Sequence, residues 1–428
     1  MKKIINIALA TAVLSGAAIT AHAAETIDPA DVVINMYGAS AQKDYWLALG
    51  GDFMTAQGCA TSGKTNAGKD YIAVKGGNCS SVGGNDIYIT YGSVASLEGI
   101  IAALGTAPLS ASLNDTCGGD NALRETVNLT TCTFPTTFGE YTTTCSMGCA
   151  DIHAGTSDVE SESFSQTSVG EVRGHLGGGV ETLDAFGPDV TGLEHYKPTI
   201  VPFAFYANNK LGTASPTALA GNLSRTQAVN LFAGKIAKWN EYKQFSAYNK
   251  DVQLCMRHAG SGTHATLDKA VFRDDTKDAT LTLLTTENTT SAPYAWFYKS
   301  SSDLKTCVEE NGGKGNGPTV ARYAIGYLDA DTAGTAKMHQ MTYQGAPAVD
   351  AASIGLVPAV SNAYINDGTY DFWSAQNVYI NTADNSATFQ ALMAFAETNI
   401  PTGKSGQWTK ASDLKVTKAT DANLPMND

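Results

Sequence analysis

Residues 252–266 read VQLCMRHAGSGTHAT and join a strand, a loop and the start of a helix. Apolar residues alternate with other residues up to Arg257, which predicts a buried strand that ends at the loop. Ser-Gly-Thr at 261–263 then opens a predicted helix, whose first N–H groups are unpaired and lie at the positive end of its dipole. Such a turn favours an oxyanion, and the planar guanidinium of an arginine suits phosphate or carboxylate. The stretch therefore predicts anion capture, although Ser and Thr are also ordinary helix caps.

The same strand–turn–helix unit recurs in the first quarter of the chain. An apolar strand over 32–37 runs into the turn 38–40, and a second strand over 87–91 runs into the turn 92–93. Parallel sheets are built from such units, and their ligands lie beyond the carboxyl ends of the strands. We therefore expect an α/β fold in which several small-residue turns converge on one ligand. At 428 residues the chain is too long for one typical core and favours two or three domains.

The first residues predict export. Lys2 and Lys3 precede an apolar run, and Ala-His-Ala at 21–23 fits a cleavage signal, so residues 1–23 are expected to be a signal peptide. No later stretch reaches the roughly 20 apolar residues that a membrane span needs. No Cys directly follows the cleavage site, so we expect a soluble protein, periplasmic or secreted, without a lipid anchor.

The charge balance argues against partners with a negatively charged surface. The formal net charge is −13, and removal of the two lysines in the signal peptide makes it −15. Such a chain repels nucleic acid and acidic membranes at long range. We expect no nucleic-acid partner, and an anion must be bound in a pocket with local donors rather than on a charged patch.

The eight cysteines predict disulfides rather than a metal site. An even count in an exported protein suggests four bridges, and the sequence cannot choose among about 105 pairings. Pairing in sequence order is the simplest expectation: Cys59–Cys79, Cys117–Cys132, Cys145–Cys149 and Cys255–Cys307. There is no C-x-x-C-H haem motif, and the spacing Cys145-x3-Cys149-x3-His153 is poor for zinc. We therefore expect no metal and no cofactor.

A carboxylate at Asp158, in the segment GTSD over 155–158, joins these donor-rich turns. One interpretation is a plain surface turn, because Asp after Ser suits turns and caps. The functional interpretation starts from the fact that an ionised Asp only accepts hydrogen bonds, so an anion pocket tolerates it only if the ligand brings a proton. Phosphate carries such a proton near neutral pH and sulfate does not. Asp158 would then accept phosphate and reject sulfate.

These turns resemble the ligand motifs of the PstS-type phosphate-binding proteins that serve bacterial ABC importers. The four matching stretches occur in order, and two further similar stretches, 223–241 and 312–331, are expected away from the ligand. The ligand motifs stand here as Tyr37-Gly-Ala-Ser40-Ala41, Tyr91-Gly-Ser93, Gly155-Thr-Ser-Asp158 and Arg257-His-Ala-Gly-Ser261-Gly262-Thr263. The resemblance implies phosphate contacts from Ser40, Ala41, Ser93, Asp158, Arg257, Ser261, Gly262 and Thr263.

The chain also departs from the family pattern. Ala259 stands where the family usually has an Asp, so Arg257 loses an expected orienting partner. Ser40-Ala41 replaces a common Thr-Phe pair. Insertions at 55–84 and 103–149 are expected to decorate the surface and to be pinned by disulfides.

The resemblance implies two α/β lobes, as in type II-like periplasmic binding proteins, that close on the ligand about a hinge of two crossing strands. We expect the outward crossing near 197–206 and the return near 370–380. Lobe one then comprises 25–196 plus 371–428, and lobe two comprises 197–370. The first three ligand turns belong to lobe one and the arginine loop to lobe two, so the ligand would bridge the lobes.

Together these features predict an exported solute-binding protein that captures inorganic phosphate between two lobes and delivers it to an ABC permease in the inner membrane. We expect a monomer that is not an enzyme. The surroundings of Ser261 lack the glycines of a nucleophile elbow, and Thr398 breaks the P-loop pattern that ends at 402–405. A secreted phosphatase, or a binder of another oxyanion on the same fold, is the main alternative. A structural or adhesive surface protein, which would bind no anion, is a third.

Overall fold

A computed structural model describes residues 25–427 apart from 111–112, 114–116, 118–119, 121, 138–139, 144, 175–178, 212–220, 274–280, 313–321, 347–361, 405–406, 422 and 424. The predicted signal peptide at 1–23 lies outside the described residues, as does part of the stretch 312–331. Within the described part of the chain, no helix has the length and apolar character to cross a membrane.

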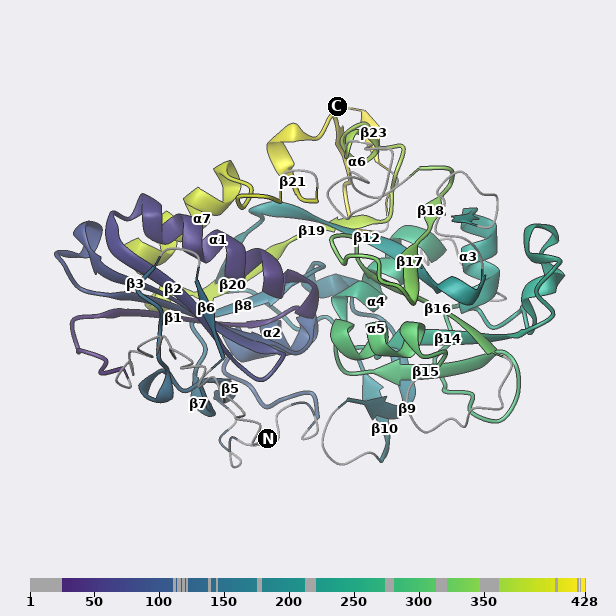
Figure 1. The fold of residues 1–428 in the computed structure, drawn as a ribbon, viewed down its shortest axis with the longest axis horizontal. Coiled ribbons are helices and arrows are strands. Elements are labelled where there is room, and N and C mark those ends of the chain that lie inside the picture. The colour runs from purple at the N-terminus through teal and green to yellow at the C-terminus, as the bar shows by residue number, and fades with distance from the viewer. Residues whose placement is uncertain are drawn as a thin grey trace, which may run out of the picture.

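Two large sheets form two lobes that lie side by side (Figure 1). The first sheet contains, in spatial order, β11 (Leu193–Tyr196), β20 (Asn377–Asn381), β8 (Ala154–Ser157), β1 (Val32–Gly38), β4 (Ile87–Ser93), β3 (Tyr71–Cys79), β2 (Cys59–Ala67) and β6 (Tyr141–Thr142). Strand β1 runs parallel to both of its neighbours, β4 and β8. The three turns that follow these strands therefore lie at one edge of the sheet.

The second sheet has the arginine strand at its centre. Its order is β10 (Val180–Asp184), β9 (Thr167–Arg173), β15 (Tyr294–Tyr298), β14 (Asp251–Arg257), β16 (Arg322–Asp329), β12 (Thr199–Asn208) and β17 (Met338–Gln340). Strand β14 pairs in parallel with β15 and β16 and is buried from Val252 onward. The predicted strand ending at Arg257 is confirmed.

Seven α-helices are described. They are α1 (Lys43–Ala56), α2 (Ser96–Ala103), α3 (Arg225–Phe232), α4 (Gly262–Thr266), α5 (Ser301–Glu309), α6 (Ala363–Asn366) and α7 (Ala387–Thr398). In Figure 1, α1 and α7 lie on one side of the first sheet and α2 on the other. The buried residues of α1 recur at helical spacing, with Tyr45, Trp46, Leu49 and Phe53 facing the core. Three short strand pairs form small sheets of their own: β5 (Leu123–Val127) with β7 (Met147–Asp151), β13 (Asn222–Leu223) with β18 (Thr342–Tyr343), and β22 (Val416–Thr417) with β23 (Met426–Asn427).

The expected pair of crossing strands connects the lobes. Strand β12 leads out of the first lobe, and β19 (Trp373–Ala375) leads back antiparallel to it, with Ile200 opposite Ala375. On the first-lobe side of this crossing, β11 pairs with β20 in the same antiparallel sense. Every residue of β12 is buried, as its nearly continuous apolar sequence indicates. The short strand β21 (Thr409–Lys410) also pairs with β12.

Strands β9 and β10 depart from the expected division at 196 and 197. They precede the outward crossing, yet β9 pairs in parallel with β15 of the second sheet, with Phe297 opposite Val172 and Tyr298 opposite Arg173. The chain thus visits the second sheet once before β12. Sequence order alone could not predict that β9 joins the second sheet. A strand with one polar side facing solvent carries no signal for which sheet it joins.

The first insertion is not a surface decoration. Strands β2 and β3 form an antiparallel hairpin within 55–84, and β3 pairs with β4, so the hairpin extends the first sheet. Most of β3 is buried. Its apolar residues therefore contribute to the core, and the disulfide Cys59–Cys79 joins the ends of the hairpin.

The disulfide pairing is partly the one expected. Cys59–Cys79 and Cys255–Cys307 are confirmed. The expected pairs Cys117–Cys132 and Cys145–Cys149 are wrong, because the bridges are Cys117–Cys149 and Cys132–Cys145. Cys149 lies in the extended strand β7, which runs away from Cys145. Extended chain would place two cysteines four residues apart at about 13 Å, which is too far for a disulfide.

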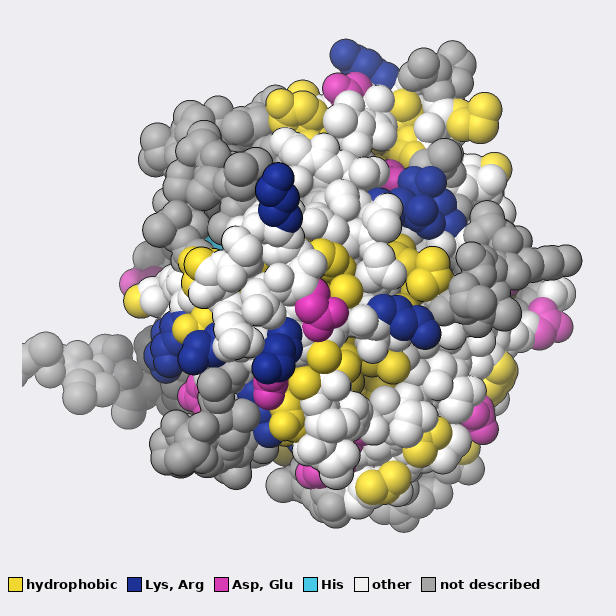
Figure 2. Space-filling model, turned by 90° about the vertical axis from the view of Figure 1, so that its right-hand side faces the viewer, with side chains coloured by type: hydrophobic (Ala, Val, Ile, Leu, Met, Phe, Trp, Pro, Cys, Tyr) yellow, Lys and Arg dark blue, Asp and Glu magenta, His cyan; other side chains and the backbone are white. Residues whose placement is uncertain are grey.

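The outer face of the second lobe carries charges of both signs. Figure 2 shows Lys and Arg side chains spread over this face among Asp, Glu and uncharged residues. The described residues on this face therefore form a surface of mixed charge, which basic groups do not dominate.

Candidate functional site

The four predicted ligand turns meet between the lobes. Ser40 follows β1, Ser93 ends β4 and Asp158 follows β8, three adjacent strands of the first sheet. Arg257 ends β14 at the centre of the second sheet and reaches Ser40 across the interface. Positions separated by more than two hundred residues are thereby brought into direct contact.

The guanidinium of Arg257 is buried, and protein atoms occupy all five of its N–H groups. The acceptors are Tyr298 O at 3.2 Å from Nε, Ser40 Oγ at 2.7 Å and Ser301 Oγ at 3.1 Å from Nη1, and Val94 O at 3.2 Å and Lys299 O at 2.6 Å from Nη2. All five acceptors are neutral, and no ion pair of Arg257 occurs among the described residues. Burial lowers the pKa of Arg257, but an arginine keeps its charge in a protein. The result is a buried positive charge whose direct partners are carbonyls and hydroxyls.

Ser301 was not among the predicted site residues. Its hydroxyl lies 3.1 Å from Ser40 Oγ and 3.1 Å from Arg257 Nη1, so three polar groups from the two lobes form a closed triangle. Ser301 is the first residue of α5, and Ser300 caps that helix by accepting a bond from Asp303 N at 3.2 Å. The signal was present in the sequence, because the apolar strand YAWFY at 294–298 is followed by a serine-rich turn and a helix.

Asp158 is buried and accepts hydrogen bonds from both lobes. Gln42 Nε2 donates to Oδ1 at 3.0 Å, Ser96 Oγ donates to Oδ2 at 3.3 Å, and Thr263 Oγ1 donates to Oδ2 at 3.4 Å. Burial raises the pKa of Asp158 to about 6, while these bonds and the charge of Arg257 act in the opposite direction. The carboxyl can therefore gain or lose a proton close to neutral pH. Gln42 and Ser96, like Ser301, were not among the predicted site residues.

The SGT turn packs directly against the first lobe. A Cβ on Gly262 would lie 2.3 Å from Ser96 Oγ and 2.8 Å from Asp158 Cβ, so only glycine permits this approach. Next to it, Leu97 N donates to Gly260 O at 3.0 Å, a backbone hydrogen bond between the lobes. Ser261 is buried at the N-cap of α4 and accepts no side-chain cap bond. Its hydroxyl is therefore not committed to the helix.

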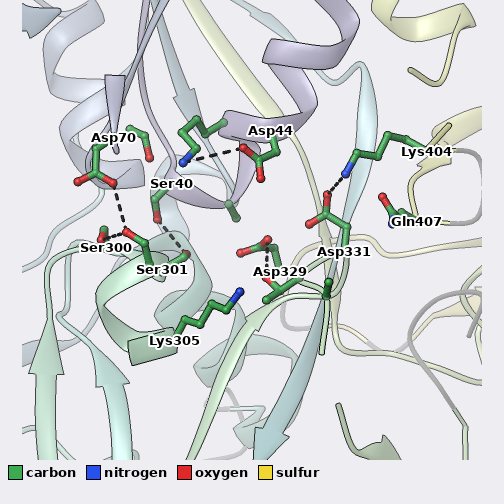
Figure 3. A pocket seen from close by; sticks show the side chains of 16 residues that line it. Ser40, Asp44, Asp70, Ser300, Ser301, Lys305, Asp329, Asp331, Lys404 and Gln407 are labelled. Carbon is green, nitrogen blue, oxygen red and sulfur yellow. Dashed lines mark hydrogen bonds and ion pairs between the residues drawn. The ribbon is translucent and has the colours of Figure 1, made fainter. Parts of the chain in front are cut away.

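Every predicted site residue thus lies at one interface. Arg257 contacts Ser40, Thr263 contacts Asp158, and Gly262 lies against Asp158. Ser261 precedes Gly262 in the chain, and Ser40, Ala41 and Ser93 line a cavity of about 430 Å³. Figure 3 shows this cavity, with Ser40 and Ser301 on one side and Asp329, Asp331 and Lys404 on the other. Whether these residues hold an anion stays a prediction at this point.

Histidines near the loops stabilise the local backbone. His258 Nδ1 accepts from Gly260 N at 3.2 Å, and His264 Nδ1 lies 2.7 Å from Tyr327 Oη. Burial, together with the charge of Arg257, lowers the pKa of both histidines, that of His264 to about 3, so they are neutral at physiological pH. They add no positive charge to the site.

Ser168 holds the arginine loop at Ala259, the position where the motif resemblance leads us to expect an Asp. Ala259 N donates to Ser168 Oγ at 2.9 Å, and both residues are buried. Ser168 belongs to β9, the strand that joins the second sheet before the outward crossing. The hairpin of β9 and β10 therefore stabilises the loop between Arg257 and Ser261.

One protein-family model matches just under half of the chain. A family model described as a PBP superfamily domain matches residues 186–397, which include both crossing strands and the second sheet apart from β9, β10 and β21. This match confirms the resemblance to binding proteins of this superfamily. No curated protein is similar enough to this chain to count as a match.

Solved structures give more distant similarities. A Clostridium perfringens protein, described as a phosphate ABC transporter substrate-binding protein with bound phosphate, has 12% sequence identity and a TM-score of 0.48 over 89% of this chain and 99% of its own. A DING protein has 15% identity and a TM-score of 0.47 over 89% of this chain and 92% of its own. A Vibrio cholerae ABC-type phosphate transport receptor has 18% identity and a TM-score of 0.31 over 49% of this chain and 68% of its own.

Proposed function

We propose that this chain is an exported solute-binding protein that captures inorganic phosphate between its lobes and delivers it to an ABC permease in the inner membrane. The observation that carries the proposal is the guanidinium of Arg257, which is buried between the lobes and bonded only to neutral oxygens. A buried charge costs several kcal/mol unless an opposite charge compensates it. An oxyanion at the lobe interface would supply that compensation.

The groups around Arg257 suit a tetrahedral oxyanion. Ser40 and Ser301 present hydroxyls from opposite lobes within hydrogen-bond distance of Nη1. A hydroxyl can accept from the guanidinium or turn to donate to a ligand oxygen. An anion that takes donors from both lobes stabilises their closed arrangement, which is how a two-lobed binding protein couples ligand capture to closure.

Asp158 supports phosphate over sulfate. An ionised carboxylate beside an anion requires a shared proton, and phosphate brings one near neutral pH whereas sulfate does not. Thr263 donates to Asp158 across the interface, so the carboxylate lies where the two lobes meet. Selectivity then arises from repulsion of an anion that has no proton to offer.

Location, partner and oligomeric state belong to the same proposal. The predicted signal peptide supports export to the periplasm, and the superfamily match supports delivery of a captured solute to a membrane permease. We expect a monomer that binds its ligand without turning it over. A secreted phosphatase or a binder of another oxyanion stays as the alternative.

Calorimetry tests the proposal directly. The mature protein is unfolded, dialysed, refolded and titrated with phosphate, arsenate and sulfate. We expect saturable binding of phosphate and no detectable binding of sulfate at pH 7.5. Binding of arsenate alone would assign a different oxyanion, and no heat with any of the three would overturn the proposal. Sustained hydrolysis of a chromogenic phosphate ester, lost in Ser261→Ala, would establish the phosphatase instead.

A further inference from the structure

The cavity at the lobe interface is larger than a phosphate ion requires. Its volume is about 430 Å³, and its lining includes Ser40 and Ser301, the two hydroxyls that contact Arg257. Small-molecule sites in proteins typically occupy roughly 300–1,000 Å³. The cavity therefore matches a small organic ligand better than a bare tetrahedral ion.

Only one side of the site opens into this cavity. On the Asp158 side the lobes are in contact, because Thr263 Oγ1 lies 3.4 Å from Asp158 Oδ2 and Gly262 has no room for a Cβ. On the other side, Ser40 and Ser301 form the boundary between Arg257 and the open space. A phosphoryl group that accepts from the Ser40 and Ser301 hydroxyls, beside the charge of Arg257, would thus have its free side toward the cavity.

The far wall of the cavity is polar and carries both charges. Asp329 accepts from Thr332 Oγ1 at 2.9 Å, and Asp331 Oδ2 lies 3.3 Å from Lys404 Nζ. Figure 3 shows the Lys305 side chain extending from α5 toward Asp329. Burial and the neighbouring Asp331 raise the pKa of Asp329, which reduces its repulsion of an anionic ligand.

This lining favours hydroxyl groups. Carboxylates accept from hydroxyls, ammonium groups donate to them, and a neutral polyol can satisfy both at once. Of the sixteen lining residues only Ala41 and Ala333 are apolar, so the wall offers little to a lipid or an aromatic ring. A second phosphate would lie against several aspartates and is disfavoured by repulsion.

We infer that the site also takes phosphomonoesters of small polyols, with the phosphoryl group at the Ser40 and Ser301 hydroxyls beside Arg257 and the polyol hydroxyls against Lys305, Asp329 and the neighbouring wall. This inference rests on the proposed phosphate function and extends its ligand class. The same residues would hold free phosphate and the phosphoryl group of an ester. The residues of the far wall would distinguish the ester from the free ion.

Three probes separate the contributions of the two ends. Stripped protein is titrated with inorganic phosphate, with methyl phosphate, which has the ester bond but no hydroxyls, and with glycerol 3-phosphate. We expect glycerol 3-phosphate to bind at least about ten-fold more tightly than methyl phosphate, since each satisfied hydrogen bond to a charged wall group adds a few-fold or more. Glycerol alone is the control for the wall without the phosphoryl contact.

Two variants test the wall itself. Ala333 is exposed at the cavity, and Ala333→Phe would fill part of the space without touching a phosphate-contacting residue. Asp329→Asn replaces one carboxyl oxygen of the wall with an amide NH2, which only donates, at nearly constant shape. Both should lower affinity for glycerol 3-phosphate about ten-fold and leave phosphate affinity within about two-fold. The matched control is Asp413→Asn, a half-exposed carboxylate away from the cavity whose replacement should change neither value.

The outcomes distinguish this inference from the proposed function. Phosphate binding with glycerol 3-phosphate no tighter than methyl phosphate overturns the inference and leaves the phosphate function intact. Binding of glycerol 3-phosphate without binding of phosphate supports the inference and overturns inorganic phosphate as the cargo. No binding of any phosphoryl compound overturns both. Equal loss of phosphate and ester affinity in Asp329→Asn and Ala333→Phe also contradicts the assignment of these residues to the polyol end.

Discussion

Arg257 Nη1 of the second lobe donates a 2.7 Å hydrogen bond to Ser40 Oγ of the first lobe. The bond joins the ends of two central parallel strands, β14 and β1, that belong to different sheets. It also brings a buried, permanently charged guanidinium to a group that can donate to an anion as well as accept from the arginine. This contact joins the two lobes directly at two of the predicted ligand turns.

Arg257→Ala should abolish most of the phosphate affinity. The expected cost is about 2–5 kcal/mol, or roughly 30- to several-thousand-fold in Kd, because the variant removes the charge that compensates the anion. Calorimetry measures the change, and Arg225→Ala, which removes a half-buried guanidinium bonded to Phe272 O, is the matched control. Unchanged affinity in a folded Arg257→Ala protein would contradict the role of this residue.

Ser301→Ala should weaken phosphate binding by a smaller amount. Loss of one hydroxyl that serves a charged group costs about 1–2 kcal/mol, or about five- to thirty-fold in Kd. Ser302→Ala is the control, because Ser302 lies in the same helical turn but donates to Asp70 rather than accepting from Arg257. If both variants behave alike, the effect belongs to the start of α5 and not to the Ser301 hydroxyl.

Asp158→Asn should relax the discrimination against sulfate. The asparagine amide donates as well as accepts, so an anion without a proton is no longer repelled. We expect measurable sulfate binding in this variant and a reduced phosphate-to-sulfate affinity ratio in calorimetry. Asp421→Asn is the control, because Asp421 is also buried and accepts from Ser163 Oγ at 2.6 Å, away from the interface. Complete exclusion of sulfate by Asp158→Asn would refute the selectivity argument.

Sulfate binding to the unmodified protein should increase as the pH falls through 6. The pKa of Asp158 is raised by burial to about 6, so the carboxyl is mostly ionised at pH 7 and mostly protonated at pH 5. Protonated Asp158 donates a hydrogen bond and carries no charge, which removes the repulsion of sulfate. We expect sulfate binding that is undetectable at pH 7.5 to become measurable at pH 5, at constant ionic strength, because the protonated fraction of Asp158 rises about ten-fold between pH 7 and pH 5. The same gain in Asp158→Asn would assign the titration to another group.

The strand–turn–helix units of this structure could be predicted because each one is encoded in a short continuous stretch of sequence. The strand that ends at Arg257 and the strands before Ser40 and Ser93 each show an apolar pattern followed by a small-residue turn. Their convergence then follows from parallel pairing, which places the ends of such strands at one sheet edge. The resemblance to the PstS-type motifs also predicted the order of the ligand turns along the chain. It predicted the two crossing strands between the lobes as well.

The features that escaped prediction depend on tertiary context. Ser301 follows an apolar strand like the other turns, but no motif marks a serine whose partner is an arginine 44 residues earlier. The Cys117–Cys149 bridge could not be read from spacing, because pairing depends on the direction of β7. The pairing of β9 with β15 likewise depends on the tertiary structure, because β9 joins the edge of a sheet whose other strands come later in the sequence.

The early visit of β9 to the second sheet limits how far the lobes can separate. Asp158 belongs to the first lobe, whereas Ser168 of β9 holds the arginine loop of the second, and only residues 159–167 connect them. A ten-residue step spans at most about 36 Å when fully extended, and here it includes the helical turn Ser161–Ser163. This short tether lies next to the ligand site and not at the crossing strands. The extended length of this segment is therefore an upper limit on how far Asp158 and Ser168 can move apart if the two lobes separate.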